Sequence, residues 1–101
     1  MNSRNELHEI LCGILGSRYV YYQPPENVKM KYPCIVYERS DIRNFHADNG
    51  VFHQTHHYMI TVIDPEPDSS IVDSISSLPK IRFHRHFVHD GLNHDVFSIY
   101  Y

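Results

Sequence analysis

Histidine is the residue type in this chain that could do chemistry, because the chain contains nine of them. Neutral imidazole is a common metal ligand and proton carrier. Seven histidines fall in the second half of the chain: His53, His56, His57, His84, His86, His89 and His94. His84 and His86 stand two apart on an expected strand, so they would share a face and could hold one cation together. Asp95 would then orient the ring of His86.

The spacing of these histidines does not favour a metal site. Zinc needs a third or fourth ligand, and the chain has neither H-E-x-x-H nor paired C-x-x-C. His8 and Cys12, four apart on a helix, would make only half a site, and a solvated helix flank is the favoured reading. We therefore expect no metal and no cofactor, with the strand histidines on a wet or subunit-facing surface.

Nucleophilic catalysis has no support in the sequence either. Cys12 and Cys34 lie in no recognisable local motif. The chain lacks G-x-S-x-G, and its four glycines leave little material for a phosphate-binding loop. We expect a protein that is not an enzyme. With no secretion signal, two free thiols are expected.

Composition places the chain among ordinary globular proteins. It has 101 residues, 42% hydrophobic and 21% charged, which predicts one domain spanning 1–101. No apolar run approaches the ~18 residues that a membrane span needs, so we expect a soluble protein with no membrane partner. A net charge of −3 argues against nucleic acid as a partner. Eight tyrosines are typical of protein–protein interfaces.

The first half of the chain predicts one helix and two strands. A capping box at Ser3–Glu6 and an apolar stripe predict a helix over 4–15, which Gly16 ends. Strands are expected over 18–23 and over 34–39. The second of these is apolar on both faces, which indicates a cover on each side. In so small a protein, another subunit is a candidate for one of these covers.

The second half predicts a long strand, a helix and a hairpin. The polar interruption over 41–50 is expected to form a projecting hairpin or loop arm. The other expected elements are a strand over 51–64, a helix over 69–77 with Asp68 as N-cap, and strands over 80–89 and 92–101. Asp90-Gly91 suits a type I′ turn, which would place His86 opposite Asp95 and Phe87 opposite His94. The fold class is α+β, a mainly antiparallel β-sheet with two helices packed on one face.

Four segments carry a resemblance to a known family. They are QPPENVKMKYPCIVYERS at 23–40, YMITVIDPEPDS at 58–69, Leu78-Pro79, and LNHDVFSIYY at 92–101. They resemble the tail terminator, or tail completion, proteins of long-tailed bacteriophages and prophages, which are often labelled minor capsid or tail proteins. Together with the leading helix, the resemblance covers nearly the whole chain.

The resemblance implies a structural role in virion assembly. Members of this family form a ring, typically six-fold, on the head-proximal end of the tail tube, which stops polymerisation and helps join the tail to the head connector. It implies a homo-oligomer whose partners are tail tube and connector proteins, located in the virion tail or neck and in the bacterial cytoplasm during assembly. The alternatives are a head-completion, connector or other small adaptor protein and, less favoured, a histidine-based metal-binding domain.

A ring protein needs arms that engage its neighbours, and the 41–56 segment is the candidate. Ring contacts join head to tail, so the same arm would meet a different surface on the next copy. The hypothesis places the oligomer contact at Phe45, His46, Asn49, Gly50 and Phe52, with Asn49-Gly50 at the tip. A surface loop without a partner is the alternative reading of the same residues.

Overall fold

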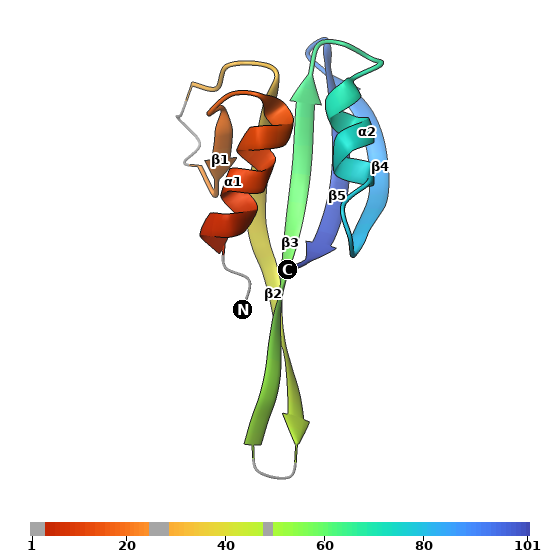
Figure 1. Cartoon of the computed structure of the whole chain (residues 1–101). Coiled ribbons are helices and arrows are strands. Elements are labelled where there is room, and N and C mark those ends of the chain that lie inside the picture. Colours follow the sequence, from red (N-terminus) through yellow and green to blue (C-terminus); the bar gives the residue numbers. More distant parts are fainter. Residues whose placement is uncertain (1–3, 25–28, 48–49) are drawn as a thin grey trace.

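The computed structural model describes residues 4–24, 29–47 and 50–101, with the side chains of these residues except 41–47 and 50–55. Two helices and five strands lie within these residues (Figure 1). In chain order they are α1 (Arg4–Leu15), β1 (Val20–Tyr22), β2 (Cys34–Ala47), β3 (Gly50–Asp64), α2 (Ser70–Ser76), β4 (Ile81–His89) and β5 (Leu92–Tyr100). The expected α+β class is confirmed.

The five strands form one sheet in the order β1-β2-β3-β5-β4. The pairs β2–β3, β3–β5 and β5–β4 are antiparallel, which agrees with the expected mainly antiparallel sheet. β2–β3 and β4–β5 are hairpins, whereas α2 and β4 separate β3 from β5 in the chain. β1 pairs with β2 in parallel, with Val20 opposite Ile35, an arrangement that the sequence did not predict. β1 is also shorter than the expected 18–23 strand.

Both helices cover the same face of the sheet, as expected (Figure 1). The core between the helices and the sheet consists of Leu7, Leu11, Cys12, Val20, Ile35, Tyr37, Tyr58, Ile60, Val62, Ile71, Ile75, Phe97 and Ile99. Leu7 and Leu11 of α1 and Ile75 of α2 are fully buried. Burial of each such side chain stabilises the fold by roughly 1.5–3 kcal/mol.

The helix ends agree with the sequence in one case and correct it in the other. Gly16 has φ of +80° and follows α1 directly, where its amide donates to the Cys12 carbonyl at 2.9 Å, so it is the expected helix stop. The N-cap of α2 is Ser69 and not Asp68. The Ser69 hydroxyl accepts from the Ile71 amide at 3.2 Å, whereas Asp68 precedes the cap by one residue.

The polar segment 41–50, expected as a projecting hairpin or loop arm, belongs to a projecting hairpin in which β2 runs to Ala47 and β3 begins at Gly50. β2 continues from Cys34 to Ala47 and pairs with β3 along its length, with a register shift between Arg39 and Asp41. Ser40 is the extra residue at this bulge. The distal parts of β2 and β3 form a hairpin that projects from the body (Figure 1).

The β4–β5 hairpin has the predicted turn and register. Asp90 and Gly91 have φ of 53° and 74°, the left-handed pair that a type I′ turn requires. His86 lies opposite Asp95 and Phe87 opposite His94, as predicted. A second register shift between Phe83 and Arg85 makes His84 a bulge residue, which the sequence did not indicate.

Candidate assembly surface

The projecting hairpin, Asp41–Ala47 with Gly50–His56, is here called the arm. β5 pairs with β3 no further along than His57, which lies opposite Tyr100. Beyond that point the described part of the arm contains two strands only. Seven residues span roughly 24 Å at about 3.4 Å each. That length accounts for the long axis of the molecule, 52 Å against 28 and 22 Å in the other directions.

The base of the arm is fixed by contacts with the body. The Ser40 hydroxyl lies 2.6 Å from Nδ1 of His57 and donates to the His57 carbonyl at 3.1 Å. Ser40 thus reaches both the side chain and the backbone of His57. The His57 ring also lies 4.5 Å, centroid to centroid, from the Tyr100 ring. The bulge residue thus ties β2 to β3 where the arm begins.

The C-terminal residue adds a second tie at the same place. The Tyr101 amide donates to the His56 carbonyl at 2.8 Å, and the His56 amide donates to the Tyr101 carbonyl at 3.4 Å. Nδ1 of His56 lies 3.4 Å from the Tyr58 hydroxyl. The end of the sheet is therefore anchored on both strands before the arm leaves it.

The candidate contact residues all belong to the outer part of the arm. Phe45 lies opposite His53, and His46 lies opposite Val51. Phe52 falls between these pairs at a second register shift, and Gly50 lies opposite Ala47 at the first pair of β3. The connection between the strands is therefore at 48–49, so Asn49 lies outside the described residues.

The sheet face away from the helices has no helix over it (Figure 1) and carries both apolar and polar side chains. Cys34, Ile63 and Val96 are buried on this face although they lie outside the helix-covered core. A shallow depression of about 250 Å³ crosses it, lined by Gln23, Pro24, Val36, Tyr37, Glu38, Met59 and Thr61. β2 thus presents apolar residues on both faces, as its sequence indicated.

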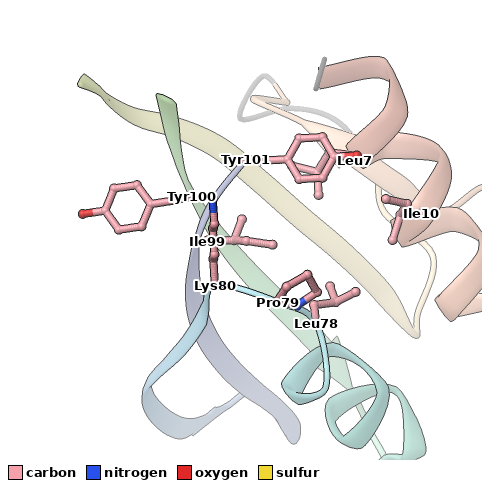
Figure 2. A pocket seen from close by; sticks show the side chains of 8 residues that line it. All are labelled: Leu7, Ile10, Leu78, Pro79, Lys80, Ile99, Tyr100 and Tyr101. Carbon is pink, nitrogen blue, oxygen red and sulfur yellow. The ribbon is translucent and has the colours of Figure 1, made fainter. Parts of the chain in front are cut away.

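A small apolar pocket lies where α1, the segment after α2 and the end of β5 meet (Figure 2). Its volume is about 130 Å³, and it is lined by Leu7, Ile10, Leu78, Pro79, Lys80, Ile99, Tyr100 and Tyr101. Figure 2 shows the Tyr101 ring beside Leu7 and the Tyr100 ring directed away. Lys80 is the one charged residue among these eight. The pocket therefore offers packing surface and no acid–base pair.

The expectation that His84 and His86 share one face of their strand is wrong. The bulge after Phe83 breaks the alternation, so His84 and His86 do not share a face. Nε2 of His84 lies 2.7 Å from the Ser98 hydroxyl on the helix-free face. Nε2 of His86 instead donates to Oδ1 of Asn93 at 3.1 Å, on the helix side. Among the described residues, no group of three or more His, Cys, Asp or Glu is placed to hold a metal ion.

The His8–Cys12 flank of α1 is not a solvated surface, contrary to expectation. Nδ1 of His8 lies 2.8 Å from the Tyr37 hydroxyl, and Cys12 is buried in the core. Burial raises the pKa of Cys12, and raises the pKa of Cys34 to about 11. Both thiols are free, as expected, and they are held in their protonated, unreactive form.

The acidic residue opposite His86 is also affected by its surroundings. Burial raises the pKa of Asp95, and the nearby His86 and His94 oppose this rise. The pair is held by the β4–β5 register and by Asn93, whose Nδ2 donates to the Asp64 and Pro65 carbonyls at 3.2 and 3.3 Å. The Asn93 contacts hold the segment that leads from β3 towards α2. The polar residues around Asp95 therefore have a structural role.

No protein-family model matches this chain, and no curated protein matches it. Within the described residues, no helix is both long and apolar enough to cross a membrane.

Proposed function

We propose that this protein is a structural component of a bacteriophage virion that forms a ring at the head-proximal end of the tail tube. The ring ends tail polymerisation and helps join the tail to the head connector. It consists of copies of this chain, six in the family that the sequence resembles. Its other partners are the tail tube and connector proteins.

The observation that carries this proposal is the arm. A two-stranded hairpin is marginally stable in water on its own. The arm nevertheless extends by about the width of the body, and its base is anchored by Ser40, His57 and Tyr101. A ribbon built and anchored in this way gains its missing stabilisation from another molecule.

The distribution of surfaces supports a head-to-tail arrangement. The arm leaves one end of the molecule, whereas the helix-free face of the sheet lies on the body. Different patches on one chain produce a heterologous contact, and such contacts form rings when the rotation between copies closes. The four segments that resemble tail terminators indicate which kind of ring this is. They favour a ring on a phage tail over a ring in another assembly.

Tail length tests this proposal. The phage that encodes the chain is grown with the gene deleted, and lysates are imaged by electron microscopy. The proposal predicts full heads beside unattached tails of irregular and excessive length. A plasmid copy of the intact gene should restore tails of uniform length.

Two other results would contradict the proposal. Tails of normal length beside empty or leaking heads would assign the protein to head completion instead. Infectious particles of normal appearance would exclude a structural role in the virion.

A further inference from the structure

The outer edge of β4 has the features of a docking strand, and these do not depend on the phage role. β4 is the last strand of the sheet, and all its residues except Ile81 are exposed. Within the described residues no strand pairs with its outer edge. Every second residue of an edge strand directs its backbone N–H and C=O away from the sheet, so this edge offers a row of hydrogen-bonding groups.

The edge is also strongly basic in a chain of net charge −3. Residues 80–89 contain Lys80, Arg82 and Arg85 and no acidic residue. Within the described part of the chain, neither Arg82 nor Arg85 takes part in an ion pair. Two exposed guanidinium groups are therefore available to an anionic partner.

The bulge in β4 gathers this charge on one face. Arg82 lies opposite Ser98 and Arg85 opposite Val96, which are two apart on β5 and so share the helix-free face. His84, the bulge residue, reaches the Ser98 hydroxyl at 2.7 Å and joins them there. Strict alternation would have placed the two arginines, three apart in sequence, on opposite faces.

An apolar component lies beside the charge. The Phe87 ring stacks on the His94 ring, with centroids 4.6 Å apart and planes at 12°, and the Arg85 guanidinium lies 5.5 Å from the Phe87 centroid. Phe83 and Val88 are 53% and 61% exposed. A partner strand along this edge would find apolar contacts alternating with positive charge.

We infer that the β4 edge binds an extended, acidic segment of a partner protein, which adds to the sheet as a further strand. Its backbone pairs with β4, and its carboxylates lie near Arg82 and Arg85. Carboxylates on a strand fit this edge better than the phosphates of a nucleic acid. A nucleic acid cannot satisfy a row of backbone donors and acceptors, and Phe87 already has one ring face against His94.

Peptide binding to the full chain tests this inference. The probe is a fluorescent nine-residue peptide in which glutamate alternates with valine or threonine, followed by fluorescence anisotropy. It should bind, and a peptide with glutamine in place of glutamate should bind about tenfold more weakly at low salt. A glutamate peptide N-methylated at alternate residues keeps its charge but loses its donors, and should not bind.

A charge-matched pair of variants locates the site. Arg82→Gln/Arg85→Gln should weaken the glutamate peptide about tenfold. Lys29→Gln/Lys31→Gln removes the same charge from exposed positions elsewhere and should leave binding unchanged. Equal loss in both double variants would show a general charge effect and overturn the inference.

Three further outcomes would also overturn it. Equal affinity for the N-methylated peptide would exclude strand addition. Tighter binding of an oligothymidylate of equal charge would assign the edge to single-stranded nucleic acid. Self-association that Arg82→Gln/Arg85→Gln abolishes, without peptide binding, would assign the edge to a second copy of the chain.

Discussion

The Tyr37 hydroxyl lies 2.8 Å from Nδ1 of His8 and links the sheet to α1 in a partly buried contact. Tyr37 is 1% exposed, and Nη1 of Arg4 donates to the same hydroxyl at 3.3 Å. Two side chains of α1 thus converge on one group of β2. The helix is positioned by this polar contact as well as by its apolar side chains.

Removing the Tyr37 hydroxyl should therefore destabilise the fold by a modest amount. Tyr37→Phe keeps the packing of the ring but removes the hydrogen bonds to His8 and Arg4. We expect the free energy of unfolding to fall by about 1 kcal/mol. Urea denaturation followed by circular dichroism measures it. The matched control is Tyr19→Phe, at a 40% exposed position, which should change stability little; equal effects would contradict the account.

Stability should depend on pH through His8. Burial, with smaller contributions from Arg18 and Arg4, lowers the pKa of His8 below 6.5 in the folded state. The folded protein then binds fewer protons than the unfolded chain between the lowered folded pKa and the unfolded value. The contribution of neutral His8 to the stability of the protein is complete above about pH 6.5. It is lost as the pH falls towards the folded-state pKa of His8.

The measurement compares the wild type with His8→Gln. The difference in unfolding free energy between them should shrink between about pH 7.5 and about pH 5.5, because only the wild type loses the contribution of neutral His8. A difference that stays constant, or grows in acid, would show that folding does not lower the pKa of His8.

The N-cap of α2 can be assigned by substituting Ser69 and its neighbour Asp68 separately. α2 has only seven residues, so it depends on its cap and on the burial of Ile71 and Ile75. Ser69→Ala should lower the free energy of unfolding by about 1 kcal/mol, because the Ile71 amide loses its acceptor. Asp68→Ala should have a smaller effect. The reverse order would restore Asp68 as the N-cap.

The thiol of Cys34 should be inert in the folded protein. It is fully buried, and its pKa of about 11 leaves about one thiolate in a thousand near pH 8. We expect a thiol reagent such as iodoacetamide to label Cys34 only after unfolding in guanidinium. Mass spectrometry of native and unfolded samples decides this. Native labelling at the unfolded rate would mean that the helix-free face opens at Cys34.

The elements with strong local signals could be predicted from the sequence. The apolar stripe and Gly16 placed α1 at its observed bounds, and Asp90-Gly91 fixed the β4–β5 register. These signals depend on residues near in sequence. The expected capping box stays a prediction, because Ser3 lies outside the described residues. The parallel pairing of β1 could not be predicted, because it depends on where the 25–33 connection returns the chain.

The candidate surfaces were harder to predict for a related reason. Polar residues in 41–47 indicated an interruption, but pairing with β3 overrides their low strand preference. The bulges at Ser40 and His84 depend on which residues the partner strand presents, so neither has a local signal. The second bulge changed the chemistry, because it separated His84 from His86 and brought Arg82 and Arg85 together.

Assembly by an arm-shortened chain tests the central claim most directly. Replacing residues 44–54 with Asn-Gly closes the hairpin at the Arg43–Thr55 pair and keeps the base of the arm. Asp90→Asn, which also retains a type I′ turn, is the control. Both proteins are added to tails from the gene-deleted lysate and imaged by electron microscopy. The account predicts that the shortened chain folds, as its circular dichroism will show, but does not bind tails, whereas the control forms terminal rings. Rings formed by the shortened chain would show that the arm is not the assembly contact.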